Sequence, residues 1–266
     1  MVQHASTLTA GAYRVSEDGV NHRFVGAGER ATGPFVFCCE HASKALPGVG
    51  LTDEERALVD DHWGSDIGAG EITERLSKKT DSVGILSRIS RLWIDVNRVE
   101  DSDTLVVDQC AGVPVSFNVG LTDSERADRL ARYHAPYHRA LDALIADRLG
   151  RGPVYLISIH SYTPVWEGTP RPMEIGVLFS EHTPAVSRVN AALKSEGFVT
   201  ALNAPYSGQS GDLIYSAMLH GERARIPYLE LEIRQDLIRT PESAEEVATR
   251  IARSLVAYGP TPGAMN

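Results

Sequence analysis

The stretch Val154-Tyr155-Leu156-Ile157-Ser158-Ile159-His160 is the part of the sequence that most directly indicates the fold. It is an almost continuous apolar run that ends in a polar residue, which is typical of a strand buried on both faces of a sheet. A second such run, Phe35-Val36-Phe37-Cys38-Cys39, is followed by Glu40-His41. Each predicted strand therefore delivers a histidine at its carboxyl end, where open α/β sheets bind their ligands.

Helical and strand-like patterns alternate along the rest of the chain. Capping-box sequences at residues 52–55 and 122–125 predict two helix starts, the second helical stretch reaching about residue 148 with a break near Pro136. We expect further helices over 65–79, 184–196, 211–219 and 241–258, and further strands over 83–86, 93–96, 174–179 and 228–233. This alternation predicts an α/β fold: a single-domain three-layer sandwich with a mostly parallel mixed sheet over residues 34–266, after an N-terminal extension over residues 1–33.

Composition excludes several classes of protein. The 266 residues carry 26 Lys and Arg against 35 Asp and Glu, a net charge of −9, which argues against a nucleic-acid partner. Three cysteines are too few for a disulfide framework, and Cys38 and Cys39 read as buried packing residues. No apolar run approaches the roughly 20 residues that span a bilayer, and the first 30 residues lack a signal-peptide pattern. We therefore expect a cytoplasmic protein without a membrane partner.

The predicted strand at residues 228–233 carries unusual charge. Alternation places Glu230, Glu232 and Arg234 on one face and leucine and isoleucine on the other. Buried charges need ionic partners or a metal, so this face indicates a functional site, unless the strand lies at an edge with a solvated face.

Three residues form a candidate metal set. His41 and His160 follow predicted strands, and Asp66 is expected in the first turn of the helix over 65–79, facing inward. Two histidines and a carboxylate with one open position are typical of catalytic zinc, and a further glutamate then serves as general base. The plainer alternatives are structural histidines and an Asp66 that complements the helix dipole.

Other residues are weaker candidates. His62 lies near Asp66 and is an alternative ligand, while His134 and His138 have a chelating spacing that Pro136 interrupts. His138 fits better as a substrate contact, and the turn-rich loop over 203–208 could shape a pocket. The sequence contains no GxxxxGK phosphate loop, no dinucleotide fingerprint and no GxSxG nucleophile elbow.

Six motifs in order resemble the N-formylglutamate amidohydrolase (deformylase) family over about residues 35–240. They are Glu40-His41-Ala42-Ser43, Asp61-His62-Trp63-Gly64-Ser65-Asp66, Trp93-Ile94-Asp95-Val96-Asn97-Arg98, Ile159-His160-Ser161, Asn203-Ala204-Pro205-Tyr206-Ser207-Gly208 and Leu231-Glu232-Ile233-Arg234. The resemblance implies a zinc-dependent α/β hydrolase related in fold to the zinc carboxypeptidases. One motif departs from the family pattern, since Glu40-His41-Ala42-Ser43 replaces Pro-His-Ser-Gly.

The resemblance also implies residue roles. It assigns His41, Asp66 and His160 as Zn²⁺ ligands and Glu232 as catalytic base, with Glu230 as the alternative base. Arg98 and Arg234 become candidates for gripping a substrate carboxylate, which suits a planar guanidinium. The remaining candidate substrate contacts are His138, Ser161, Asn203 and Tyr206.

The expected activity is hydrolysis of the amide C–N bond of a small N-acyl amino acid such as N-formylglutamate. Two alternatives remain open at this point. One is a zinc peptidase or peptidoglycan-type amidase, and the other is a non-catalytic protein that binds a small acid on the same fold.

Overall fold

The computed structural model describes residues 20–209 and 212–258. Its centre is a seven-stranded sheet in the order β1-β3-β2-β6-β11-β9-β10. Four neighbouring pairs run parallel, while β1 is antiparallel to β3 and β9 is antiparallel to β11. The strands are β1 (His22–Gly26), β2 (Phe35–Cys39), β3 (Val83–Ser87), β6 (Tyr155–Tyr162), β9 (Ile175–Leu178), β10 (Thr200–Leu202) and β11 (Tyr228–Arg234). The predicted mostly parallel mixed sheet is confirmed.

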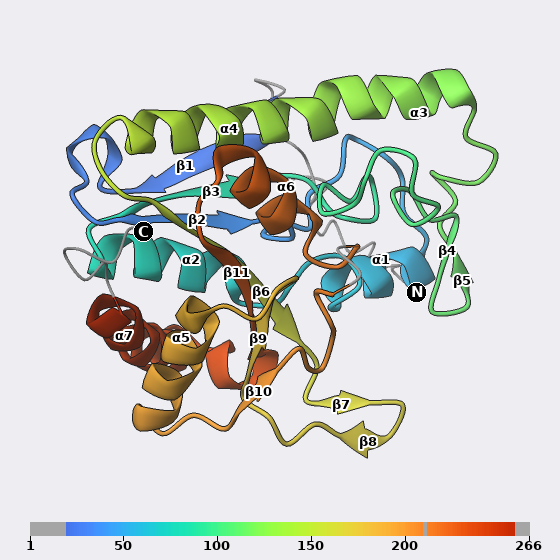
Figure 1. Ribbon diagram of the computed structural model, residues 1–266. Helices are drawn as coiled ribbons and strands as arrows, with labels where there is room; N and C mark the ends of the chain where they lie inside the picture. Colours follow the sequence, from blue (N-terminus) through green and yellow to red (C-terminus); the bar gives the residue numbers. More distant parts are fainter. Residues whose placement is uncertain (1–19, 210–211, 259–266) are drawn as a thin grey trace, which may run out of the picture.

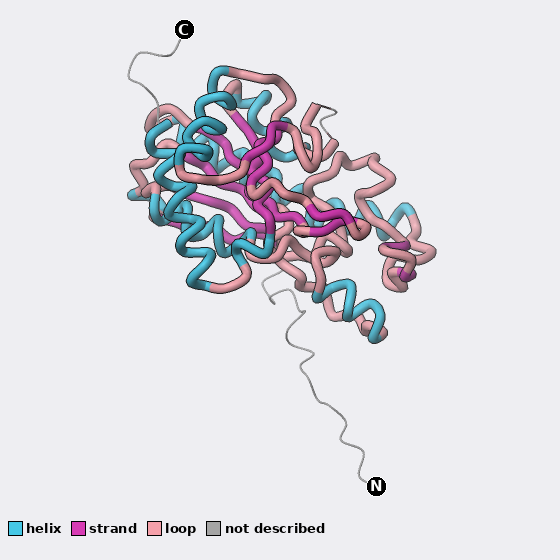
Figure 2. Tube along the Cα trace, turned by 90° about the horizontal axis from the view of Figure 1, so that it is seen from below, coloured by secondary structure: helices cyan, strands magenta, loops and turns pink. Residues whose placement is uncertain are grey.

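Helices cover both faces of this sheet, so the molecule has three layers (Figure 1). One layer holds α2 (Ala69–Lys79), α5 (Pro184–Ser195) and α7 (Pro241–Tyr258), and Figure 2 shows helices of this layer lying across the strands. The opposite layer holds α4 (Ala135–Leu149) and α6 (Tyr215–Ala224). Outside the layers lie α1 (Asp53–Asp60), α3 (Asp123–Arg129) and the two small hairpins β4–β5 (Gln109–Cys110, Val113–Pro114) and β7–β8 (Val165–Trp166, Thr169–Pro170).

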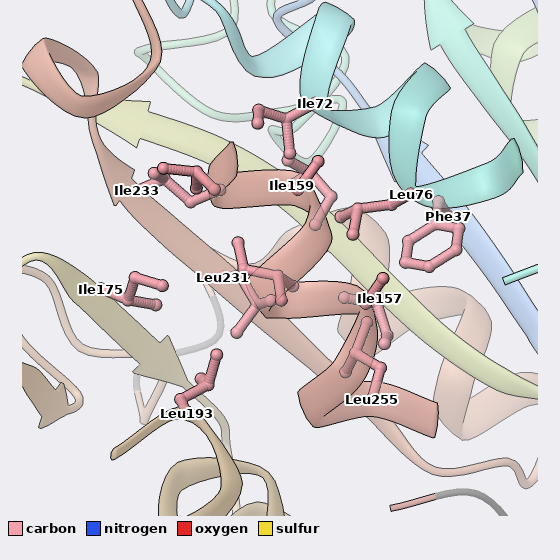
Figure 3. Packing of buried hydrophobic residues seen from close by; sticks show 14 of the residues in the cluster. Phe37, Ile72, Leu76, Ile157, Ile159, Ile175, Leu193, Leu231, Ile233 and Leu255 are labelled. Carbon is pink, nitrogen blue, oxygen red and sulfur yellow. The ribbon is translucent and has the colours of Figure 1, made fainter. Parts of the chain in front are cut away.

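Each face of the sheet has its own apolar core. The larger cluster joins Ile157 and Ile159 of β6 and Leu231 of β11 to Leu76 of α2 and Leu255 of α7, all buried (Figure 3). On the other face Tyr137, Leu141 and Ile145 of α4 pack on Val36, Cys38 and Leu156. Because both faces are covered, the polar side chains that these strands carry are buried with them.

Several local predictions are confirmed. Thr52 and Thr122 form complete capping boxes with Glu55 and Glu125 at the starts of α1 and α3. The helical stretch after Thr122 changes to a π-turn over Leu130–His134, and α4 then restarts with Pro136 in its first turn, where a missing N–H costs least. Helix α6 begins at Tyr215 and ends at Ala224, later than the predicted 211–219, and residues 210–211 lie outside the described ranges.

One strand prediction was wrong, and one strand was not predicted. Residues 93–96 form turns, because successive apolar side chains pack into different clusters: Trp93 beside Leu92, Ile94 beside Leu105, and Val96 against α4. Conversely, residues 22–26 of the predicted extension form β1, an antiparallel edge strand that pairs with β3. Residues 1–19 of that extension lie outside the described ranges.

Asp66 does not lie in a helix. Helix α2 begins at Ala69, and Gly68 at its N-cap has a left-handed backbone with φ of 80°. A Cβ at Gly68 would approach the carbonyl oxygen of Ile238 to 2.6 Å, so the bend that separates Asp66 from the helix requires glycine. Within the described ranges no helix is both long and apolar enough to cross a membrane.

Candidate active site

The site lies where three adjacent parallel strands end. His41 follows β2, His160 lies near the end of β6, and Glu232 lies on β11. The register places Glu232 beside His160 and Glu230 beside Ser158. Since β2, β6 and β11 run in one direction, their carboxyl ends bring these side chains to a single edge of the sheet.

Three electron-pair donors converge at this edge. The Nδ1 atoms of His41 and His160 are 3.1 Å apart. Oδ2 of Asp66 lies 3.5 Å from Nδ1 of His41 and 2.8 Å from Nδ1 of His160. In a tetrahedral zinc site with bonds of about 2.0–2.1 Å, neighbouring ligand atoms are roughly 3.3 Å apart. The triangle therefore has the size that a zinc ion requires, and these side chains form a candidate metal cluster.

The far side of each imidazole is held by a carboxylate. Nε2 of His41 lies 2.7 Å from Oδ1 of Asp95, and Nε2 of His160 lies 3.1 Å from Oε2 of Glu40. If a metal is bound, donation of both Nε2–H groups to carboxylates would leave both Nδ1 lone pairs to face the ion beside Asp66. Carboxylate–histidine pairs of this kind orient metal ligands and raise their basicity.

Glu40 is fixed in turn by two hydroxyl groups. Ser158 Oγ donates to Oε2 at 2.8 Å, and Tyr137 OH donates to Oε1 at 3.1 Å. Burial opposes ionisation of Glu40, but its hydrogen bond and attraction to His160 outweigh burial and lower its pKa to about 2. Glu40 is therefore a buried anion whose position depends on β6 and α4.

Asp66 is also held from several sides. Its backbone N–H donates to the carbonyl of His41, and its Oδ2 accepts the backbone N–H of Ser161 at 3.2 Å. Arg91 donates to Asp66 Oδ1 at 3.4 Å and to Asp95 Oδ2 at 3.2 Å. Burial would raise the pKa of Asp66, but attraction to His41 and hydrogen bonding to His160 hold it well below its usual range.

The surroundings of His160 favour its protonated form. Burial alone would lower the pKa of His160, yet attraction to Glu230 and hydrogen bonds with Asp66 and Glu40 raise it well above its usual value. The convergence of lone pairs and carboxylate oxygens therefore favours protons or a cation at this point, which fits the donor chemistry of a metal site.

Glu230 and Glu232 are buried with one oxygen each, Oε2, left without a hydrogen-bond partner. Burial, reinforced by neighbouring carboxylates, raises the pKa of Glu230 to about 7 and that of Glu232 to about 8. Oε2 of Glu230 lies 3.5 Å from Nε2 of His160, on the side of the ring away from the donor triangle. His160, Glu230 and Glu232 form a second possible donor set, but Glu40 already occupies Nε2 of this histidine.

A cavity of about 400 Å³ opens onto these groups. It is lined by the three candidate ligands, by both glutamates, and by three predicted substrate contacts, Arg98, Ser161 and Tyr206. The Arg98 guanidinium donates through Nη1 to the carbonyls of Asn97 and Asp212 and through Nε to Thr104, and Nη2 makes no hydrogen bond with the described residues. Ser161 Oγ donates to the carbonyl of Ile67, which steadies the loop that carries Asp66.

The structure does not bring the other predicted contacts to this cavity. Arg234 pairs with Asp236 at 2.8 Å and donates to the carbonyls of residues 171–173. Asn203 accepts the N–H groups of Phe179 and Gly208 and so braces its own loop. His138 donates through Nε2 to the carbonyl of Val96 and contacts His220 at 2.8 Å through Nδ1, so it supports the Asp95–Arg98 segment from behind.

The alternative histidines take other partners. His62 lines the cavity, but its Nδ1 lies 3.1 Å from Asp61 and it joins no metal cluster among the described residues. Nε2 of His134 donates to the carbonyl of Arg98 at 2.8 Å, so its four-residue spacing from His138 serves backbone support instead of chelation.

Sequence reasoning gave no role to Glu40, Asp95 or Arg91. Two signals were present: Glu40 directly precedes a predicted ligand, and Asp95 belongs to a motif that was recognised only for its arginine. Arg91 had no signal, because its contacts with Asp66 and Asp95 arise from the turns that replace the predicted strand at 93–96.

Fold and site together define a three-layer α/β protein with a candidate metal centre at the carboxyl edge of its sheet. The sequence profile of N-formylglutamate amidohydrolases matches residues 33–239, so the chain belongs to the N-formylglutamate amidohydrolase family, as the six motifs predicted. No curated protein matches the sequence.

Several solved structures are similar over most of the chain, including proteins from Agrobacterium tumefaciens and Ralstonia eutropha JMP134. A gene product of Agrobacterium tumefaciens has a TM-score of 0.82 at 26% identity, covering 92% of this chain and 98% of its own. An N-formylglutamate amidohydrolase from Ralstonia eutropha JMP134 has a TM-score of 0.70 at 19% identity, covering 90% of this chain and 97% of its own. The similarity to the Ralstonia eutropha protein shows a shared fold.

Proposed function

We propose that this protein is a zinc-dependent amidohydrolase that cleaves the amide C–N bond of a small N-acyl amino acid, N-formylglutamate being the family's example. The observation that carries the proposal is the triangle formed by His41, Asp66 and His160 beside two buried glutamates in one cavity. Membership of the amidohydrolase family supports hydrolysis of an amide.

The zinc ligands in this proposal are the Nδ1 atoms of His41 and His160 and one carboxylate oxygen of Asp66. A zinc ion bound there would supply Lewis acidity toward the substrate carbonyl and toward a water molecule. Asp95 and Glu40 would keep each imidazole in the tautomer that directs Nδ1 to the ion.

Glu232 is the proposed catalytic base. Its carboxylate lines the cavity and its Oε2 has no hydrogen-bond partner, so this oxygen is available to take a proton from water. In this role Glu232 removes a proton from the attacking water and delivers it to the leaving amine nitrogen. Glu230 contacts the far side of His160 and acts in this proposal as a positioning residue.

Arg98 is the proposed contact for the substrate carboxylate. It lines the cavity, and its Nη2 makes no hydrogen bond with the described residues. A guanidinium whose Nη1 and Nε are fixed by protein oxygens presents its remaining N–H groups in a defined direction, which favours recognition of a carboxylate.

Metal analysis and hydrolysis assays of the purified chain test this proposal. We expect about one zinc per chain and hydrolysis of N-formyl amino acids, both lost in His160→Ala. His182→Ala is the matched control, because His182 is exposed and contacts Ser187 instead of the site. A wild-type protein that binds no zinc, or a His160→Ala variant that hydrolyses at the wild-type rate, would refute the proposal.

A further inference from the structure

The positive charges around the cavity are the first guide to its substrate. Among the described residues, Arg91 and Arg98 are the guanidinium groups that line it. Arg91 is neutralised by Asp66 at 3.4 Å and Asp95 at 3.2 Å. Arg98 lies 4.0 Å from Asp95 and is the group that can receive a carboxylate. The cavity therefore offers one substrate carboxylate a guanidinium partner.

Two other arginines lie near this region but do not line the cavity. Arg234 is bound by Asp236 and by backbone carbonyls. Arg171 is packed over the rings of Tyr162, Trp166 and Tyr206, with its guanidinium carbon 5.1–5.6 Å from their centroids, and it does not line the cavity. A second substrate carboxylate inside the cavity would have neither of them as a partner.

One wall of the cavity is aromatic. His62, Trp63 and Trp166 all line it, with ring centroids 4.4 Å apart for the first pair and 5.8 Å apart for the two tryptophans. Trp166 belongs to the β7–β8 hairpin, which projects from the body of the molecule (Figure 1). Asp61 lies 3.1 Å from His62 and offsets any charge on that ring.

Apolar side chains continue this surface. Leu92, Val107 and Cys110 also line the cavity, and they pack in one apolar cluster with Trp63. A carboxylate placed against such a surface would lose its water without gaining an ionic partner, whereas an aromatic or aliphatic group would gain contact with the tryptophan rings.

From these contacts we infer that the substrate has a single carboxylate and an apolar or aromatic side chain, with Trp63 and Trp166 as the residues that determine this specificity. The inference rests on the proposed function and narrows its substrate class. In this arrangement Arg98 holds the α-carboxylate, the scissile amide faces Glu232, and the side chain lies against the tryptophans.

The experiment compares N-formyl-L-phenylalanine, N-formyl-L-leucine and N-formyl-L-glutamate as substrates of the zinc-loaded full chain. We expect kcat/KM for the phenylalanine and leucine compounds to exceed that for the glutamate compound by about tenfold or more. Trp166→Ala should lower kcat/KM for the phenylalanine compound about tenfold and change that for the glutamate compound less than twofold, and Trp166→Phe should restore most of the loss.

Phe24→Ala is the matched control, because Phe24 is an aromatic residue of the edge strand β1 that is 55% exposed and does not line the cavity. Circular dichroism of each variant shows whether the fold is kept. A preference for the glutamate compound, or equal losses for both substrates in Trp166→Ala, would overturn the inference while leaving the proposed function intact.

A binding measurement separates the two proposals. Calorimetric titration of the zinc-loaded Glu232→Gln variant with the same three compounds reports affinity without turnover. Tighter binding of the phenylalanine compound would support the inference even if the wild-type chain hydrolysed none of the three, a result that would refute the proposed function. Equal or weaker binding of the phenylalanine compound would overturn the inference.

Discussion

Replacement of Glu232 by glutamine should make the metal-free protein more stable at alkaline pH while it removes hydrolysis. The structure buries this carboxyl group beside Glu230 and Asp66, and Oε2 has no hydrogen-bond partner. Ionisation of Glu232 in the folded state therefore costs more than in the unfolded chain. Glutamine has nearly the same shape but no charge to ionise.

The size of the effect follows from linkage between protonation and folding. The pKa rises from an ordinary value of 4.5 to about 8, which corresponds to about 5 kcal/mol once the pH exceeds both values. Between these values the folded state binds more protons than the unfolded state, so the free energy of unfolding falls as pH rises. About 4 kcal/mol of that loss lies between pH 5 and pH 9.

Urea unfolding of both proteins at pH 5, 7 and 9, after removal of metal by a chelator, measures this difference. The free energy of unfolding of Glu232→Gln minus that of wild type should grow by about 4 kcal/mol from pH 5 to pH 9. Any cost of an unpaired amide is the same at each pH and cancels from this comparison. Glu246→Gln, a change of an exposed glutamate on α7, is the control and should parallel wild type.

The wild-type and Glu232→Gln curves would refute the reasoning if they ran parallel across this pH range. Glu230→Gln provides a second comparison, because the pKa of Glu230 rises only to about 7. The gain in free energy of unfolding of Glu230→Gln over wild type should therefore stop growing at a lower pH than that of Glu232→Gln. Hydrolysis of N-formyl amino acids by Glu232→Gln at the wild-type rate would separately remove this residue from the catalytic role.

Three further outcomes follow from other contacts. Asp95→Asn should weaken zinc binding roughly 10–100-fold in a chelator competition, because it removes the anion 2.7 Å from Nε2 of His41. Leu231→Ala should lower the free energy of unfolding by about 2–5 kcal/mol in urea, since Leu231 is fully buried in the larger core (Figure 3). Gly176→Ala should lower the melting temperature, because a Cβ there would lie 2.2 Å from the carbonyl oxygen of Ala204, and a variant that melts like wild type would show that the loop gives way without cost.

The sequence predicted the parts of the site that depend on strand ends. His41, His160 and the glutamates of β11 could be placed because buried strands have a period of two and parallel neighbours end at a common edge. Asp66 was selected as a ligand from an expected helical face, yet it lies in the loop before α2, so the helical argument for it was wrong.

Residues held by irregular structure could not be placed in this way. Residues 93–96 read as a strand, but their apolar side chains enter three clusters. The turns there place Asp95 against His41 and Arg91 against Asp66 and Asp95. Turns lack a side-chain period, so the sequence predicted neither these contacts nor the engagement of Arg234 by Asp236. The aromatic wall was missed for the same reason, since Trp63 and Trp166 lie in a loop and a hairpin that are distant in sequence.

Carboxylates also outnumber arginines locally, in the lining of the candidate active site. Asp66, Asp95, Glu230 and Glu232 line one cavity with two guanidinium groups, so the four carboxylates outnumber the arginines by two. In the metal-free protein the raised pKa values of the two glutamates remove that excess by protonation. A bound dication would remove it instead and would leave Arg98 free to attract one anionic group. The net charge of −9 is a property of the whole chain and therefore does not exclude an anionic substrate at Arg98.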